Sequence, residues 1–240
     1  MLALNALLKS AHRLQGWVEQ RFPNWAHRRH HHKWERKWAD PEYNPFWKTD
    51  RPQKELVEAT SSGWFAKNQR VIDVGCGNGE VSWWLAEQGY TVLGLDYSAA
   101  AIDNCRRRSA GTSNAPTFEV ADFCSTNLRL EPAGSVIDRG CFHRIAENSR
   151  PIFALNIAAA TVEGGHFVLL AGTFQHPQFL HYPYVRSERE LREHVEEIFG
   201  RYFAIERAEP AVINAAEGEQ AMPAVAFWMV RKPESPTRQG

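Results

Sequence analysis

The sequence predicts an α/β fold: a doubly wound, mostly parallel seven-stranded sheet with an N-terminal helical lid. Two observations carry this prediction. From Arg70 onward, short apolar runs alternate with stretches of helical periodicity, a pattern typical of parallel strands joined by crossover helices. The first 51 residues differ in composition, because they hold ten Lys/Arg against five Asp/Glu and five of the nine tryptophans.

Length and composition narrow the class of protein. The 240 residues are 43% hydrophobic and 23% charged, which indicates a folded domain with an appended segment rather than a disordered chain. Lys plus Arg and Asp plus Glu are 28 each, so no overall field favours nucleic acid or an anionic membrane. The four cysteines form no CxxC pair, and no apolar run reaches about 18 residues. We therefore expect a reduced, cytoplasmic protein with no transmembrane segment.

The N-terminal segment is predicted to contain two helices. Leucines and other apolar residues recur at helical spacing up to about Gln20, and a second helix is expected over His27 to Ala39. Pro41, Pro45 and Pro52 then favour an extended, aromatic connection. The first helix is amphipathic and could contact a membrane surface, although we expect no membrane partner from the overall charge.

Three histidines of the second helix have a spacing that could hold a metal. These are His27, His30 and His31, but the basic residues around them favour a solvated basic face, and we expect no metal.

Seven apolar runs are predicted to form the strands of the sheet. They are 71–74, 91–95, 117–120, 135–137, 165–171, 202–207 and 224–230. Ser98 is the expected N-cap of the helix after the second strand, and Ser187 with Glu190 forms a capping box. No helix separates the last two strands, so they are expected to pair antiparallel.

The most informative stretch is VIDVGCGNG, residues 71–79, where a buried strand leads into three glycines and then a helix. Glycines allow positive φ and a close approach of ligand to backbone. A dinucleotide loop would read GxGxxG, but here the third glycine comes one residue early and Glu80 would lie beside a pyrophosphate. The loop therefore favours a nucleoside ligand with an amino-acid end, although a tight turn without a ligand is the alternative. Asp73 could order the loop through its amides or meet an ammonium group.

Two more acidic residues follow strands at the same edge. Asp96 ends the second strand, where a carboxylate can accept hydrogen bonds from both ribose hydroxyls; helix capping is the alternative. Asp122 can receive an adenine amino group while Phe123 covers the base, against the alternative of a solvated turn.

The ordered series VIDVGCGNG, LGLDYS, VADF and SVIDRGCFHRI resembles the motifs of class I S-adenosylmethionine-dependent methyltransferases over residues 70 to about 230. The resemblance implies a Rossmann-like methyltransferase fold whose final strand is antiparallel. It also implies that S-adenosylmethionine, with S-adenosylhomocysteine as product, is held across the carboxyl ends of the strands.

The DRG at residues 138–140 and the Trp-rich segment 34–47 are similar to the thiopurine, thiol and tellurite methyltransferase group. In that group an N-terminal segment closes over the cofactor and the strand-four arginine faces the pocket. We accordingly divide the chain into a basic, Trp-rich lid segment (1–52), a methyltransferase domain (53–232) and a frayed tail (233–240).

The residues that match these motifs are the predicted cofactor-binding set. They are Asp73, Gly75, Cys76, Gly77, Asn78, Gly79, Asp96, Tyr97, Ser98, Asp122, Phe123, Asp138, Trp38 and Trp47.

Arg139 and His143 are the predicted catalytic residues. Arg139 could attract an anionic acceptor, or it could form a salt bridge that fixes the lid. His143 could remove a proton, or it could serve only packing. A soft acceptor that is already ionised near neutral pH needs no general base, because proximity supplies most of the rate.

Two aromatic stretches are candidates for lining the site. Trp38, Phe46 and Trp47 could surround the sulfonium by cation–π attraction, or they could only plug the exposed end of the sheet. The stretch 173–185, with two histidines and two tyrosines, could line an acceptor pocket or form an ordered surface loop.

The sequence thus predicts methyl transfer from S-adenosylmethionine to a small-molecule acceptor, such as a thiol or other soft nucleophile. The alternative is a non-catalytic cofactor-binding module whose basic N-terminal segment binds a macromolecule or a membrane surface. A nicotinamide-dependent reductase is disfavoured by Glu80 and by the register of the glycines. With no nucleic-acid-binding domain attached, we expect no nucleic-acid partner.

Overall fold

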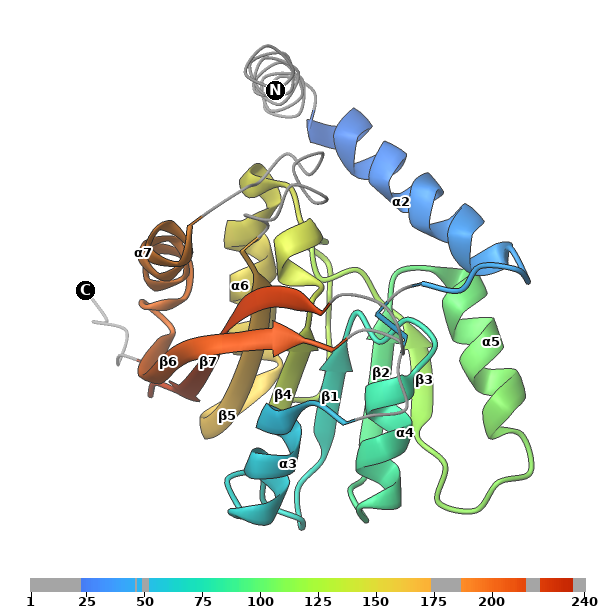
Figure 1. The fold of residues 1–240 in the computed structure, drawn as a ribbon, viewed down its shortest axis with the longest axis horizontal. Coiled ribbons are helices and arrows are strands. Elements are labelled where there is room, and N and C mark those ends of the chain that lie inside the picture. The colour runs from blue at the N-terminus through green and yellow to red at the C-terminus, as the bar shows by residue number, and fades with distance from the viewer. Residues whose placement is uncertain (1–22, 46, 49–51, 174–186, 215–220, 235–240) are drawn as a thin grey trace.

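A computed structural model describes residues 23–45, 47–48, 52–173, 187–214 and 221–234. Its centre is a seven-stranded sheet in the order β3-β2-β1-β4-β5-β7-β6, with helices on both faces (Figure 1). The first five strands run parallel, and β7 is antiparallel to both β5 and β6. The predicted mostly parallel sheet with an antiparallel final pair is therefore confirmed.

The strands lie where the apolar runs predict them. They are β1 (Val71–Val74), β2 (Val92–Asp96), β3 (Thr117–Val120), β4 (Ala133–Arg139), β5 (Thr161–Gly172), β6 (Phe203–Ile213) and β7 (Met222–Arg231). The last four are longer than predicted, because pairing with a neighbouring strand continues past the end of each apolar run.

Among the described residues, helices separate most strands, but β3 leads to β4 and β6 leads to β7 without one. The helices are α2 (Pro23–Ala39), α3 (Lys54–Ser61), α4 (Glu80–Glu87), α5 (Ala99–Ser109), α6 (Arg150–Ala159) and α7 (Glu188–Phe199), with 3-10 turns at Phe142–Arg144 and Glu147–Ser149. Pro23 begins α2, where the first turn needs no amide donor from it. The helix predicted up to Gln20 lies outside the described residues.

The predicted caps are present. Ser98 accepts a hydrogen bond from the amide of Ala101, and Ser187 with Glu190 forms both bonds of the capping box. These caps satisfy amides that the first helical turn leaves without a partner, and they fix where α5 and α7 begin.

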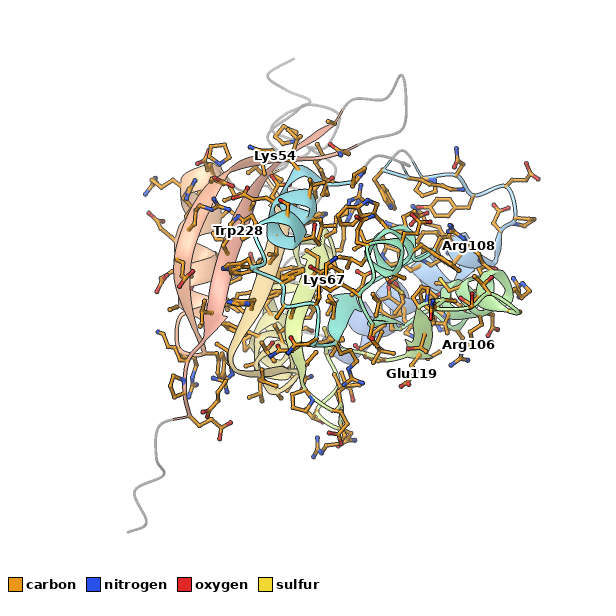
Figure 2. All side chains as sticks on the ribbon, turned by 90° about the horizontal axis from the view of Figure 1, so that it is seen from below. Lys54, Lys67, Arg106, Arg108, Glu119 and Trp228 are labelled. Carbon is orange, nitrogen blue, oxygen red and sulfur yellow. The ribbon has the colours of Figure 1, made fainter. Side chains whose placement is uncertain are left out.

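Two apolar layers hold the sheet between its helices. Phe153 of α6 and Phe199 of α7 are fully buried on one face, and Leu56 of α3 and Leu85 of α4 are buried on the other. Burial of each such side chain contributes about 1.5–3 kcal/mol. One end of the sheet is the edge strand β3, beside which α5 packs. Figure 2 labels Glu119 of β3 and Arg106 and Arg108 of α5 there.

Helix α2 lies above the carboxyl edge of the strands, and its C-terminal end reaches α5 (Figure 1). The Asn104 side chain donates a hydrogen bond of 3.0 Å to the carbonyl of Trp38, which ties the two helices together. The division of the chain at residue 52 and the closing of this segment as a lid stay predictions. Among the described residues, no helix has both the length and the apolarity to cross a membrane.

Candidate active site

A cavity of about 160 Å³ opens at the carboxyl edge of the parallel strands. It is lined by residues at the ends of β1, β2 and β3, by residues that follow β4, and by Ile213 and Met222. Trp34, Trp38 and Trp47 of the N-terminal segment also line it. The cavity therefore lies where ligands bind in open parallel sheets.

The glycine loop is built by backbone hydrogen bonds to β2. The amides of Gly75 and Cys76 donate to the carbonyl of Leu95 at 2.7 and 3.0 Å, and the amide of Gly77 donates to the Asp96 carboxylate at 3.0 Å. Asp96 therefore orders the loop.

Side chains pack closely against this loop. Gly75 and Gly77 have φ of +67° and +55°, where a Cβ is strained. A Cβ on Gly75 would lie 2.6 Å from Cβ of Cys141, and one on Gly77 would lie 2.9 Å from the Trp38 ring. Both positions therefore require glycine, because the backbone has positive φ and because a Cβ would clash with a neighbouring side chain.

Asp73 is buried at the end of β1 and lines the cavity. Its carboxylate accepts a hydrogen bond of 2.6 Å from the Ser82 hydroxyl. Burial raises the pKa of Asp73 to about 7, and nearby Glu80 adds to the rise, while the Ser82 bond opposes it. The prediction that Asp73 orders the loop amides is wrong, since Asp96 does so; a role toward an ammonium group stays a prediction.

Asp96 is held by amides on both of its carboxylate oxygens. Gly77 donates to one oxygen, and Ser98 donates to the other at 2.9 Å. Burial raises the pKa of Asp96, and these amides oppose the rise. Each oxygen retains capacity for a further donor, and the residue lines the cavity. The geometry is compatible with a pair of ribose hydroxyls.

Tyr97 lines the cavity beside Asp96. Its ring lies 4.7 Å from the ring of His31 of α2, and burial raises the pKa of the Tyr97 hydroxyl. Of the three histidines considered as metal ligands, only the side chain of His31 is described.

Four predicted cofactor-binding residues do not line the cavity: Asn78, Gly79, Ser98 and Asp138. The Ser98 hydroxyl donates to Glu35 and caps α5. A Cβ on Gly79 would lie 2.8 Å from the Phe118 ring, so that glycine allows helix and strand to pack closely.

Asp138 is not among the residues that line the cavity. Its carboxylate accepts the amide hydrogens of Cys141 and Phe142 at 2.6 and 2.8 Å, which folds the chain into the 3-10 turn after β4. Burial raises the pKa of Asp138 to about 7. The carboxylate stabilises this turn, and a cofactor role for Asp138 stays a prediction.

Asp122 and Phe123 line the cavity after β3. Asp122 accepts the amide hydrogen of Cys124 at 2.8 Å. Phe123 is only 5% exposed, and its ring centroid lies 5.8 Å from that of Phe153. The Phe123 ring is therefore part of the core and also lines the cavity, and covering of an adenine base by this ring stays a prediction.

The indoles over the cavity form one cluster with Tyr43. The ring centroids of Trp34 and Trp47 are 5.8 Å apart, those of Trp34 and Trp38 are 6.4 Å apart, and Tyr43 lies 5.2 Å from Trp38. Trp34 was not predicted as a site residue, although its i, i+4 spacing with Trp38 was a usable signal. Phe46 and the predicted loop 174–185 lie outside the described residues.

Arg139 joins three segments of the chain. Its guanidinium donates to the carbonyls of Trp47 and Asn214 at 3.0 and 3.1 Å and to Oε1 of Gln53 at 3.3 Å. Burial lowers the pKa of Arg139, and nearby Glu80 opposes this. Arg139 thus fixes the connection to the N-terminal segment through carbonyls rather than through the predicted salt bridge.

His143 is buried beside the cavity, and its Nδ1 accepts the amide hydrogen of Gly172 at 3.0 Å. Burial lowers the pKa of His143 well below its usual value, and Arg144 lowers it further. The neutral ring therefore carries its proton on Nε2, as assigned from this hydrogen bond. A ring in this state offers a donor on Nε2 instead of a basic nitrogen, which argues against the predicted proton removal.

Arg144 was missed by the sequence-based prediction. It lines the cavity, and its guanidinium carbon lies 5.7 Å from the ring centroids of both Trp34 and Trp47. Its position shortly after the carboxyl end of β4 was the available signal.

Comparison with known proteins places this geometry in a family. Residues 71–165 match the family described as a methyltransferase domain. The 2-heptyl-1-hydroxyquinolin-4(1H)-one methyltransferase of Mycobacteroides abscessus is 30% identical over 174 residues, which cover 71% of this chain and 74% of that protein.

Two solved structures are similar in fold. One comes from work on the conversion of a disulfide bond into a thioacetal group during echinomycin biosynthesis; it has a TM-score of 0.66 and 25% identity, covering 80% of this chain and 87% of that one. TehB from Haemophilus influenzae has a TM-score of 0.57 and 17% identity, and the match covers 74% of this chain and 62% of that chain. The sheet order, the glycine loop and these relatives together show that the chain belongs to the class I S-adenosylmethionine-dependent methyltransferases.

Proposed function

We propose that the protein transfers a methyl group to a small-molecule acceptor that carries a soft nucleophile, with thiols included. The observation that carries this proposal is the largely apolar and aromatic lining of the cavity. Besides the carboxylates and glycines, Ile145, Phe153, Ile213 and Met222 line it, together with three indoles. Such a surface suits a compact apolar acceptor, because small-molecule sites are concave and mostly apolar.

A relative supports the same class of acceptor. The methyltransferase of Mycobacteroides abscessus is named for 2-heptyl-1-hydroxyquinolin-4(1H)-one, a bicyclic ring with an alkyl chain. We extend to this chain only the coarse feature, a flat and largely apolar acceptor. Membership of the thiopurine, thiol and tellurite group remains part of the proposal.

The carboxylates that line the cavity fit the cofactor. S-adenosylmethionine supplies an electrophilic methyl on a sulfonium and also carries an ammonium group. We propose that Asp96 binds the ribose, that Asp73 and the glycine loop hold the amino-acid end, and that Asp122 receives the adenine amino group. Gly75 and Gly77 line the cavity with positive φ, a conformation that lets the backbone approach a ligand closely, and this supports the fit.

Two of the predicted aromatic residues keep a proposed role at the sulfonium. Trp38 and Trp47 line the cavity, and an aromatic face attracts a cation by about 0.5–2 kcal/mol. Arg139 binds the carbonyl of Trp47, so we assign it to positioning this aromatic cover.

The experiment is transfer of a labelled methyl group from S-adenosylmethionine to a panel of thiols, N-hydroxy heteroaromatics, halides and tellurite. We expect label in at least one small apolar acceptor, and less label with Asp96→Ala when S-adenosylmethionine is limiting. Calorimetry with S-adenosylhomocysteine runs in parallel. Cofactor binding with no transfer to any member of the panel contradicts a small-molecule acceptor of this class.

A further inference from the structure

One histidine of the basic helix α2 lies at the cavity. The sequence favours a solvated basic face for His27, His30 and His31, yet His31 lines the cavity and is only partly exposed, whereas its neighbour His32 is exposed. Within the described part of the chain, no cluster of histidine, cysteine and acidic side chains is arranged to hold a metal ion. His31 is therefore a cavity residue to which neither the sequence nor the site described above assigns a role.

Helical spacing places His31 on the face of α2 that packs toward the end of β2 and α5. His31, Glu35 and Trp38 stand at i, i+4 and i+7, so they share one side of the helix. The Glu35 carboxylate accepts the hydrogen of the Ser98 hydroxyl at 2.6 Å, and the carbonyl of Trp38 accepts one from Asn104 at 3.0 Å. These two attachments hold the C-terminal half of α2 and thereby fix the position of His31 one turn before Glu35.

The His31 ring contacts the residue that follows Asp96. Its centroid lies 4.7 Å from that of Tyr97, and the two ring planes are tilted by 32°. Burial raises the pKa of Asp96, and the charge of nearby His31 is one of the effects that oppose the rise. His31 thus lies close to the carboxylate that we assign to the ribose.

The His31 ring has hydrogen-bonding capacity left for a ligand. Among the described residues it makes ring contacts with Tyr97 and His32 but no hydrogen bond. A neutral imidazole carries one N–H donor and one acceptor nitrogen, and a protonated imidazole carries two donors. In either state the ring can donate a hydrogen bond to a molecule in the cavity.

A ribose hydroxyl matches this pair of side chains. An ionised carboxylate can only accept, so a hydroxyl that binds to Asp96 donates its hydrogen. The oxygen of the same hydroxyl keeps lone pairs, and these can accept from a neighbouring N–H. Asp96 and His31 line the same cavity and supply the acceptor and the donor that one hydroxyl requires.

We propose that His31 is a cofactor-binding residue carried by α2, and that its imidazole donates a hydrogen bond to a ribose hydroxyl whose own hydrogen is accepted by Asp96. This inference rests on the proposed ribose site at Asp96. Helix α2 then contributes a polar contact to the cofactor, in addition to the indoles with which it lines the cavity.

The first test measures by calorimetry the affinity for S-adenosylhomocysteine and for its 2′-deoxy and 3′-deoxy analogues. His31→Phe keeps an aromatic ring beside Tyr97 but has no N–H. We expect this variant to bind S-adenosylhomocysteine about fivefold more weakly than the wild type does. It should bind one of the two deoxy analogues as tightly as the wild type does, because the hydroxyl that uses the donor is then missing.

His32→Phe is the matched control. His32 is the next residue of the same helix, is exposed and does not line the cavity. We expect this variant to bind all three ligands as the wild type does. An unchanged affinity of folded His31→Phe for S-adenosylhomocysteine, or an equal loss toward all three ligands, overturns the inference.

The proposed function fails in a different way. A wild-type protein that does not bind S-adenosylhomocysteine removes the cofactor assignment, and an unaltered affinity in folded Asp96→Ala removes the ribose site. Weaker binding by Asp96→Ala together with unchanged binding by His31→Phe leaves both standing and refutes only the role of His31.

The second test uses only the wild-type protein, so it does not depend on the folding of a variant. Diethyl pyrocarbonate acylates unprotonated imidazole nitrogens, and tandem mass spectrometry follows the reaction at His31 and His32 separately. We expect bound S-adenosylhomocysteine to slow acylation of His31 severalfold and to leave that of His32 unchanged. No slowing at His31, or equal slowing at both residues, overturns the inference.

Discussion

The hydroxyl of Ser98 donates a hydrogen bond of 2.6 Å to Glu35, and the second oxygen of the same carboxylate accepts the amide hydrogen of Ala100 at 3.1 Å. A carboxylate of α2 therefore lies at the N-terminus of α5, where the helix dipole favours negative charge. Because Ser98 also donates its amide to Asp96, one short chain of hydrogen bonds links α2 to the residue proposed to bind the ribose.

Glu35→Gln should loosen this link by about 1 kcal/mol, because the charged part of the interaction is lost at a half-buried site. We expect the amides of residues 31–45 to exchange hydrogen about fivefold faster, as measured by mass spectrometry. Glu42→Gln is the control, since Glu42 is exposed in the same segment. Equal protection in Glu35→Gln and wild type would contradict the assigned link.

Asp96→Ala should weaken binding of S-adenosylhomocysteine by about 1–3 kcal/mol, through lost charged hydrogen bonds and a less ordered Gly77. Calorimetry measures the affinity. Asp103→Ala, an exposed change on α5, should bind as the wild type does. An unaltered affinity in folded Asp96→Ala removes Asp96 from the ribose site.

Gly75→Ala should destabilise the protein more than Gly89→Ala. Both glycines have positive φ, but a Cβ on Gly89 meets nothing within 4 Å, whereas one on Gly75 meets Cys141. Gly89→Ala should therefore cost only the conformational strain of about 1–2 kcal/mol. Urea unfolding of the two variants measures the difference, and equal losses would mean that the contact with Cys141 adds nothing.

Binding of S-adenosylhomocysteine should strengthen as the pH rises through about 7. The pKa of Asp73 is raised to about 7 by burial, so the group is mostly protonated below this value. An ammonium of the ligand beside it favours the ionised form and lowers its pKa, hence binding at neutral pH releases a proton. Calorimetry in buffers of different ionisation enthalpy counts that proton, and Asp73→Asn should abolish it. Proton release that persists in Asp73→Asn would assign it to another group.

The same raised pKa values affect stability. Asp73 and Asp138 have pKa values of about 7 in the folded protein against 3.8 as the ordinary value. The folded state therefore binds more protons between these values, so the free energy of unfolding of the ligand-free protein should fall as pH rises from about 4 to 7 and then level off. Thermal unfolding across this range measures it. Rising stability over the same range would contradict the burial of both carboxylates.

His143→Asn should leave the pH dependence of methyl transfer where it is. The Asn side-chain oxygen can accept the amide hydrogen of Gly172 in place of Nδ1, and neither side chain supplies a base. A steady-state pH profile checks this. Loss of one limb of the profile in the variant would restore His143 as a base.

The sequence by itself determined where the strands lie and which residues form the glycine loop. Strand positions, the antiparallel final pair, the caps at Ser98 and Ser187 and the three glycines at positive φ depend on local periodicity and on conformations that only certain residues adopt. Such information lies within a few residues along the chain, so a single sequence displays it.

Only the tertiary structure decided how side chains from distant segments are used. Glu35 meets Ser98 across 63 positions, and Arg139 meets the carbonyl of Trp47 across 92. Asp138 resembled a site residue because it ends a strand, yet the turn after β4 takes up its carboxylate. Local patterns do not encode these pairings, because each depends on where the packed sheet brings two segments together.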